Sequence, residues 1–319
     1  MDNAKNPVNT PKVRYIEVTE LANLQRLDNY LIKLWKGVPK SHIYRLIRGG
    51  NVRINGSRCR PKQKLNTGDT IRLPPVRLSN RDQTSKTYHP KILNECTLYE
   101  DSSILVIDKP SGIAVHGGTK IADNVIDSLR HFRKSDQFLE LVHRLDKDTS
   151  GCLILAKNLP TLRKLHKAFA SQPTSSISKT YLALLSGDWI SGPREVRLKL
   201  TKKIDVGGDK KTSVDDNGQH AISNFIPIRY YNGSVLVKVQ LKTGRMHQIR
   251  SHAAAIGHPV IGDRKYGSSV ANKKYRKMGL KRLFLHATEV KFPHPTTEKY
   301  MSIKSTLPAD LKLFMEKLL

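Results

Sequence analysis

The sequence predicts an α+β protein in which a small basic α/β domain precedes a larger domain built on a mixed or antiparallel sheet. Three observations indicate this class. The chain has 319 residues, enough for about two domains. A polar stretch without apolar periodicity, residues 79–90, separates two regions of different composition. After it, strand-like apolar runs outnumber helices and do not alternate with them, which argues against a doubly wound parallel sheet.

The charge of the chain points to a polyanionic partner. Lysine and arginine number 56 and the acidic residues 27, which gives a formal net charge of +29. A folded protein with this charge repels itself, and a nucleic acid is a better partner for it than an acidic membrane surface. Residues 11–80 hold 15 basic and four acidic residues, a net charge of +11. The remaining +18 is spread diffusely over residues 81–319.

The chain shows no feature of secretion or membrane insertion, so we expect a soluble cytoplasmic protein. No apolar stretch near the N-terminus resembles a secretory signal, and no apolar run reaches the ~20 residues of a transmembrane helix. Cys59, Cys96 and Cys152 lie far apart without a C-x-x-C pair, which argues against a disulfide framework or a zinc ribbon. His247 and His252 lie five residues apart without an adjacent glutamate, so no metal site is expected either.

The basic N-terminal region carries both helical and strand signals. Leucines recur at helical spacing from Leu24 to Leu34, and a second amphipathic run follows Pro39. Asn55-Gly56 is a strong signal for a two-residue hairpin turn. The expected elements are helices over residues 24–35 and 40–48 and strands over residues 52–54 and 70–73.

This region also presents a candidate RNA-binding surface. Four carboxylates cannot neutralise fifteen cations in so small a domain, which favours contacts with RNA phosphates over a merely solvated basic face. The residues expected in these contacts are Lys40, Arg45, Arg48, Arg53, Arg58 and Arg60. The segment from residue 26 to residue 73 resembles the S4-like RNA-binding domain, whose fold packs two helices on a small β-element. The resemblance implies an RNA-binding domain over residues 14–78, followed by the linker at 79–90.

Beyond the linker, residues 91–319 carry the pattern of a larger domain. Short apolar runs predict buried strands, and two amphipathic stretches predict helices, the second with Pro308 near its start. The expected strands are residues 104–107, 153–156, 181–185 and 235–239, and the expected helices are residues 162–169 and 309–318.

A charged cluster between two apolar runs is the main candidate for chemistry. Residues 143–148 (HRLDKD) lie between strand-like segments, on a loop that rigid elements would hold. Asp146, surrounded by so many cations, is expected to stay ionised and could serve as a nucleophile or a base. From the residues alone, a salt-bridged turn without a catalytic role is the alternative interpretation of this loop.

Five motifs together resemble the RluA family of pseudouridine synthases. The segment HRLDKDTSGCLILAK at residues 143–157 is similar to the family signature H-R-L-D-x-x-T-S-G. The other motifs agree in order: DKPSG at 108–112 with AVHGG at 114–118, KTYLA at 179–183, TGRMHQIRSH at 243–252 and HPVIGD at 258–263. Joined to an S4-like domain, they resemble the RluC and RluD branch of the family, and GVPKSHIYR and AVHGG favour the RluC type.

The resemblance implies a fold and a reaction for residues 91–319. The fold would be that of a pseudouridine synthase, a mixed and mostly antiparallel sheet with flanking helices. The family isomerises uridine within RNA without a cofactor: the bond from ribose to uracil N1 is cut, the base turns, and C5 is joined to the ribose. For this branch the substrate is large-subunit (23S) ribosomal RNA, either free or within an assembling ribosomal particle.

The resemblance also assigns roles to individual residues. Asp146 matches the catalytic aspartate of the family, and Arg144 matches the side chain that fills the space left by the flipped base. Tyr181 matches an active-site tyrosine suited to stacking on uracil and to proton movement. Arg245 matches the ion-pair partner of the aspartate. Met246 departs from the family, which usually has threonine there, so the local support of Arg245 is expected to differ.

Several alternatives stay open at this stage. His143, His247 and Arg250 are expected to be structural or to position RNA. The aspartate could attack the ribose, add to the uracil ring or remove a sugar proton, and each role requires the same placed carboxylate. An RNA-binding factor without activity, or a hydrolase that releases free uracil, would share most of these features.

Overall fold

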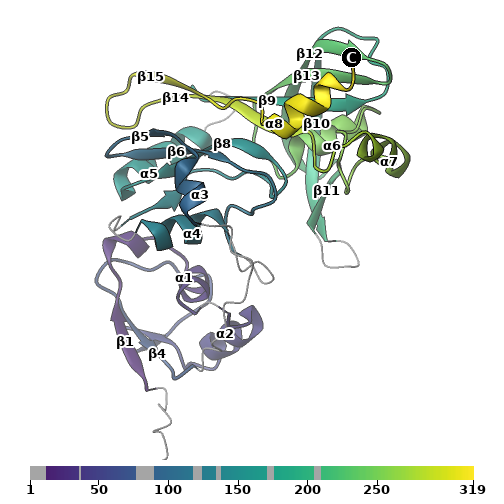
Figure 1. Ribbon diagram of the computed structural model, residues 1–319. Helices are drawn as coiled ribbons and strands as arrows, with labels where there is room; N and C mark the ends of the chain where they lie inside the picture. Colours follow the sequence, from purple (N-terminus) through teal and green to yellow (C-terminus); the bar gives the residue numbers. More distant parts are fainter. Residues whose placement is uncertain are drawn as a thin grey trace, which may run out of the picture. The chain divides into compact units, whose positions relative to one another are not determined.

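The computed structural model describes residues 12–35, 37–76, 90–117, 124–133, 138–170, 176–204 and 210–319. The chain divides into two compact units, residues 1–84 and 85–319 (Figure 1). Each unit has a hydrophobic core of its own. The predicted linker at 79–90 lies outside the described residues except for Pro90, where a helix begins. No helix in the described part of the chain is long and apolar enough to span a membrane.

The N-terminal unit is a four-stranded antiparallel sheet with two helices. Its strands follow the order β1-β4-β2-β3. The elements are β1 (Arg14–Glu17), a 3-10 turn (Glu20–Ala22), α1 (Leu27–Leu34), α2 (Lys40–Arg48), β2 (Arg53–Ile54), β3 (Ser57–Arg58) and β4 (Thr70–Leu73). Both helices bury one face, and their inward residues share a core with Ile71 of β4.

The predicted elements of this unit are confirmed, and one boundary differs by more than one residue. Asn55 and Gly56 both have positive φ, 48° and 76°, as the two-residue hairpin between β2 and β3 requires. The first helix was expected from Leu24 but begins at Leu27. Leu24 instead takes a left-handed conformation (φ 62°) and donates its N–H to the Leu65 carbonyl, so it cannot continue a helix.

The larger unit contains one sheet of eleven strands within its described residues, with helices around it (Figure 1). Its helices are α3 (Pro90–Glu95), α4 (Val125–Phe132), α5 (Leu159–Ala170), α6 (Gln248–Ala255), α7 (Ser269–Lys277) and α8 (Ala309–Glu316). Its strands are β5 (Thr97–Glu100), β6 (Ile104–Lys109), β7 (Glu140–Leu141), β8 (Ser150–Ala156), β9 (Ser178–Ser186), β10 (Arg194–Ile204), β11 (Lys210–Val214), β12 (Gln219–Tyr231), β13 (Ser234–Leu241), β14 (Leu285–Pro293) and β15 (Tyr300–Lys304).

The strand order confirms a mixed and mostly antiparallel sheet. It runs β11-β10-β12-β13-β9-β14-β8-β6-β5, with β15 beside β14 and β7 beside β8. The parallel pair is β14 with β8, the sixth and seventh strands of this order. The expected strands correspond to β6, β8, β9 and β13 and the expected helices to α5 and α8, each within a few residues. The α+β class is therefore confirmed.

The parallel pairing of β8 and β14 depends on Gly151. This residue has a φ of +113°, and a Cβ atom placed on it would lie 2.2 Å from the Ala287 carbonyl oxygen of β14. Only glycine therefore lets β14 pass directly against the first residues of β8. Those residues follow immediately on the charged loop at 143–149, so this contact also places the loop.

We predict that Gly151→Ala lowers the free energy of unfolding by about 2–5 kcal/mol, because a side chain there combines backbone strain with overlap against the Ala287 backbone. Urea titration followed by circular dichroism measures the change. Gly192→Ala is the matched control, since no atom lies within 4 Å of a Cβ at that position. Equal stability of the two variants would contradict this account.

Candidate active site

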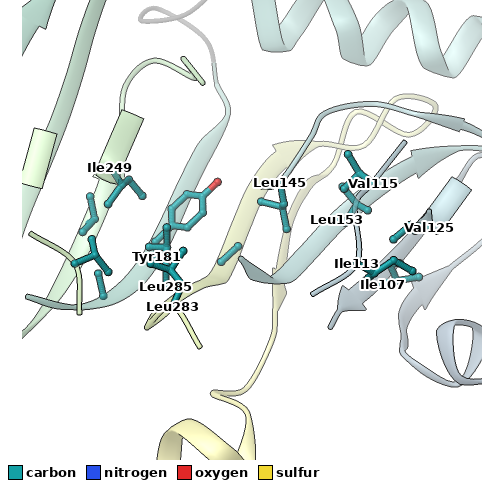
Figure 2. Close-up of a cluster of buried hydrophobic side chains, with 14 of the residues drawn as sticks. Ile107, Ile113, Val115, Val125, Leu145, Leu153, Tyr181, Ile249, Leu283 and Leu285 are labelled. Carbon is teal, nitrogen blue, oxygen red and sulfur yellow. The ribbon is translucent and has the colours of Figure 1, made fainter. Parts of the chain in front are cut away.

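The loop at 142–149 is anchored in the core through Leu145. This side chain is buried, and it points toward Leu153 and Val115 in the hydrophobic cluster of Figure 2. Its neighbours in sequence have the opposite exposure, since Arg144 is exposed and the Asp146 side chain is 17% exposed. The alternation therefore fixes the loop by its apolar residue and presents the two charged residues outward.

A second loop holds the first one from the side. Lys109, at the end of β6, is fully buried, and its Nζ donates to the carbonyls of Pro110 (2.7 Å), Ile113 (2.9 Å) and Lys147 (3.1 Å). The Lys147 carbonyl also accepts from the Gly112 N–H at 2.9 Å. Burial lowers the pKa of Lys109 to about 7, although nearby carboxylates oppose the shift. The DKPSG motif thus fixes the backbone of the loop that carries Asp146 by hydrogen bonds to the Lys147 carbonyl.

Asp146 forms an ion pair with Arg250 of α6. The Arg250 Nη1 lies 3.2 Å from Asp146 Oδ2, while the rest of the guanidinium binds Asp263 through two bonds of 2.6 and 2.8 Å. Burial opposes the charge of Arg250, but the hydrogen bonds and charge of Asp263 raise its pKa above the ordinary value. Within the described residues, no group donates a hydrogen bond to Asp146 Oδ1. One carboxylate oxygen is therefore held and the other is available to a ligand.

This arrangement corrects the sequence-based assignment of Arg245 as the ion-pair partner. Arg245 is exposed, and its Nε donates to the His220 carbonyl at 3.2 Å. The chain turns sharply before α6, where His247 has a φ of 51° and Gln248 Oε1 accepts from the Arg245 N–H. The turn directs Arg245 toward β12, whereas Arg250 lies on the buried face of the helix. The partner is thus the residue expected to be structural.

His247 is held beside Asp146 by a hydrogen bond to Tyr266. The Tyr266 hydroxyl accepts from the Thr212 N–H at 2.7 Å and lies 2.8 Å from His247 Nδ1. The other ring nitrogen, Nε2, lies 3.8 Å from Asp146 Oδ2. Burial lowers the pKa of His247, even though the charge of Asp146 opposes the shift. A neutral imidazole therefore lies beside the carboxylate.

Tyr181 and Lys179, both on β9, lie against the same site. Tyr181 is buried, and Figure 2 shows its ring beside Leu285, with the hydroxyl directed away from Leu283 and Leu285. Burial, helped by the charge of Asp146, raises the pKa of Tyr181, so its phenol stays neutral. Lys179 is also buried, its ammonium lies 5.4 Å from the centre of the Phe169 ring, and burial lowers its pKa to about 8.

His143 is structural in this arrangement. Its Nε2 accepts the Ile154 N–H at 3.1 Å, and its ring stacks on Phe169 at a centroid distance of 5.1 Å. Burial lowers the pKa of His143 to about 3, which keeps the ring neutral. The residue therefore ties the start of the loop to β8.

These residues line one cavity of about 710 Å³. Its wall contains Asp146 and Tyr181 together with cationic side chains from several elements, namely Arg144, Lys179, Lys202, Arg245 and Arg250. Arg144 donates no hydrogen bond to any described residue, so its guanidinium can reach a bound molecule. The structure thus brings all four predicted site residues of the larger unit, Arg144, Asp146, Tyr181 and Arg245, to one cavity, and Asp146 pairs there with Arg250, which was not among them.

The six predicted RNA-binding residues all lie on the surface of the N-terminal unit. Each is exposed: Lys40, Arg45 and Arg48 on α2, Arg53 and Arg58 on β2 and β3, and Arg60 just after β3. Arg53 lies opposite Arg58 on one side and Arg72 on the other. Like charges on paired strands repel one another, which a bound polyanion would relieve.

Sequence reasoning gave no role to Lys109, Lys179, Asp263 or Tyr266. All four lie within or beside the recognised motifs. A buried lysine in an apolar run was a usable signal for the first two, because lysine is rarely buried without partners. The role of Tyr266 depends on contacts with residues 19 and 54 positions away and had no local signal.

A carboxylate held by a buried arginine, in a cavity walled by cations, is typical of an enzyme site and suits an anionic substrate. Comparison with known proteins identifies the family. The family model for RNA pseudouridylate synthases matches residues 103–255, and that for the S4 domain matches residues 25–71. The chain belongs to the RNA pseudouridylate synthase family and is accordingly an isomerase with an S4 domain.

Individual relatives align with nearly the whole chain. The ribosomal large subunit pseudouridine synthase C of Escherichia coli (strain K12) is 41% identical over 314 residues, which is 97% of this chain and 98% of that protein. Its counterpart in Haemophilus influenzae is 40% identical over 96% of this chain and 95% of that protein. The solved structure of human RNA pseudouridylate synthase domain containing 4 is 24% identical, with a TM-score of 0.59 over 72% of this chain and 95% of that one, and shares the fold.

We predict that Lys109→Met lowers the free energy of unfolding by about 2–4 kcal/mol, because the carbonyls of Pro110, Ile113 and Lys147 lose their common donor. Urea titration measures the loss, and Lys299→Met at an exposed position is the control. The wild type should also gain stability as the pH rises from about 7 to 10.5, because the unfolded lysine then binds the proton that the folded one has released. If Lys109→Met kept this rise in full, the assignment to Lys109 would be wrong.

Proposed function

We propose that this protein converts specific uridines of large-subunit ribosomal RNA to pseudouridine in the cytoplasm, with Asp146 as the essential carboxylate. The ribosomal RNA, free or in an assembling particle, is the substrate that the names of the relatives support. The observation that carries the proposal is the state of Asp146, which Arg250 holds through Oδ2 while Oδ1 is available in the cavity.

The hold on Asp146 suits it for the step that breaks the glycosidic bond. A carboxylate that attacks carbon or removes a proton must point one oxygen at the reacting atom and keep it there. Arg250 cannot move toward the substrate, because Asp263 holds its guanidinium by two further bonds. His247 lies 3.8 Å from the same carboxylate oxygen and adds no further charge, because burial lowers its pKa. The free oxygen is therefore the reactive one.

Tyr181 contacts the flipped uracil, and Arg144 fills the position in the RNA that the uracil has left. Tyr181 presents a neutral phenol to the cavity, and its raised pKa makes it a stacking surface and hydrogen-bond donor in preference to a base. Extruding a uridine from folded RNA costs a few kcal/mol. Arg144, exposed on the wall of the cavity, can stack in the vacated position and bind neighbouring groups, which lowers that cost.

The N-terminal unit contributes to binding through its exposed cations. The six predicted residues occupy α2, the hairpin of β2 and β3 and the residue that follows. Lys40 and Arg48 lie 5.2 and 5.8 Å from the centre of the Tyr44 ring, which holds their side chains along the outer face of α2. These positions suit contacts with the phosphates of structured RNA.

We predict that Asp146→Asn reduces pseudouridine formation in large-subunit ribosomal RNA by at least about 10³-fold while RNA binding persists, because the amide keeps the shape and loses the charge. Mass spectrometry of the RNA measures the product. Asp148→Asn, an exposed neighbour on the same loop, is the control and should retain activity. A fully active Asp146→Asn would overturn the proposal. Free uracil as the product would indicate a hydrolase, and RNA binding without any product would indicate a binding factor.

A second pair of variants distinguishes the two arginines. Arg250→Lys keeps a positive charge but cannot bond both Asp263 and Asp146, so we expect kcat to fall roughly 10²-fold. Arg245→Lys, which loses only its bond to a backbone carbonyl, should change KM more than kcat. Single-turnover kinetics at saturating RNA separates these effects. The reverse ranking of the two variants would restore Arg245 as the partner of Asp146.

A further inference from the structure

The positive charge of the larger unit is concentrated around α7. Residues 264–282 contain eight lysines and arginines and no acidic residue. This density exceeds that of the whole N-terminal region, where a net +11 is spread over residues 11–80. The expectation of a diffuse charge beyond residue 81 is therefore wrong for this segment. Figure 1 shows α7 at one side of the larger unit, well separated from the β14–β15 hairpin.

Packing directs the basic face of α7 to solvent. Tyr275 is the buried residue of the helix: its ring contacts Phe314 at 6.2 Å, and its hydroxyl donates to the Gly233 carbonyl. At 100° per residue, Lys273 and Lys277 lie on the opposite face, one turn apart. Both are exposed, and no described carboxylate forms an ion pair with either.

The repulsion between Lys273 and Lys277 lowers the stability of α7. Like charges at positions i and i+4 of a helix repel each other by a few tenths of a kcal/mol. The helix dipole favours cations in the last turn, which accounts for Arg276 and Lys277. It does not account for Arg264 before the helix or for Lys281 after it. A basic segment kept against this repulsion indicates a negatively charged ligand.

The segment is connected to the active-site cavity by further cations. The Lys265 Nζ donates to the carbonyl of Lys210 on β11 at 3.3 Å, and the Lys211 Nζ lies 5.2 Å from the centre of the Tyr266 ring. Tyr266 is the residue that binds His247 beside Asp146. The entry to α7 is thus attached to both β11 and the site.

Strand β11 itself forms part of the cavity wall. Thr212, the residue after Lys211, lines the same cavity as Arg144 and Lys202. A path of positive charge therefore leads from the cavity wall through β11 to the segment before α7. We call this path the basic strip; its members are Lys210, Lys211, Arg264, Lys265, Lys273, Arg276 and Lys277.

We propose that the basic strip binds the sugar-phosphate backbone of the RNA that flanks the target uridine. The inference rests on the proposed function and adds to it a docking surface on the larger unit, separate from the S4 domain. A strand whose base occupies the cavity must leave it across the rim, and β11, which carries the first members of the strip, lines that cavity. Lysines on an exposed helix face give contacts with phosphates without base specificity.

The chemistry of α7 favours RNA over an anionic membrane. A helix that lies on a membrane needs a broad apolar face opposite its basic one. The apolar face of α7 is occupied, because Tyr275 packs in the core with Phe314. Val270 is the large apolar side chain of this helix that is strongly exposed, at 79%. One valine does not provide a membrane-binding surface.

The test compares two double variants that remove the same charge. Lys273→Gln with Lys277→Gln alters the basic strip, and Lys299→Gln with Lys304→Gln alters exposed lysines of the β14–β15 hairpin. Binding to transcribed 23S ribosomal RNA is measured by filter binding from 50 to 300 mM salt, and thermal unfolding checks the fold of both. We expect the first variant to bind roughly tenfold more weakly and its salt slope to fall by roughly 1.4–1.8, as for two lost phosphate contacts, while the hairpin variant matches the wild type.

The other possible results of this comparison would contradict the proposal. Equal losses in the two variants, or an unchanged salt slope in the first, would overturn the proposal. So would a loss of binding to anionic phospholipid vesicles in the first variant without a loss of RNA binding. Pseudouridine formation by the wild type is assayed on the same RNA. If the wild type forms none, the proposed function fails, whereas the comparison of the two variants still decides whether the strip binds RNA.

Discussion

The active site depends on one buried guanidinium. Arg250 is 5% exposed and joins Asp263, which is 1% exposed, to the partly exposed Asp146. Removing one partner from such a buried pair costs about 3–5 kcal/mol, because it leaves a charge without compensation. The same contact joins three parts of the chain: the loop before β8, helix α6 and the turn before α7. Stability and the orientation of the carboxylate therefore rest on a single side chain.

The rest of the site supports that contact from outside. Lys109 fixes the backbone of the Asp146 loop through the Lys147 carbonyl, and Gly151 lets β14 close against the end of that loop. Tyr266 holds the ring of His247 beside the carboxylate. Each of these residues fixes the position of Asp146 or of a side chain beside it, and none needs to touch the substrate. This explains why the recognised motifs extend well beyond the aspartate.

The sequence was most informative where a signal is local. Helix α2 and strand β4 were expected with the bounds that the structure shows, because a hydrophobic period and adjacent glycines or prolines mark both. Strands β10 and β12 were missed, because exposed lysines, arginines and other polar residues interrupt their apolar alternation. The two strands exist because they pair with each other and, through β12, with β13.

The sequence by itself determined that the protein is basic, that it has a small RNA-binding domain before a larger α+β domain, and that Asp146 is the candidate carboxylate. These conclusions follow from composition, from short-range periodicity and from motifs that are contiguous in the chain. Only the tertiary structure decided which cation holds Asp146 and where the charge beyond residue 81 gathers. Arg250 lies 104 positions from Asp146, and Arg245 is as plausible in sequence. The turn before α6 separates the two arginines in space, and no local pattern encodes which one faces the carboxylate.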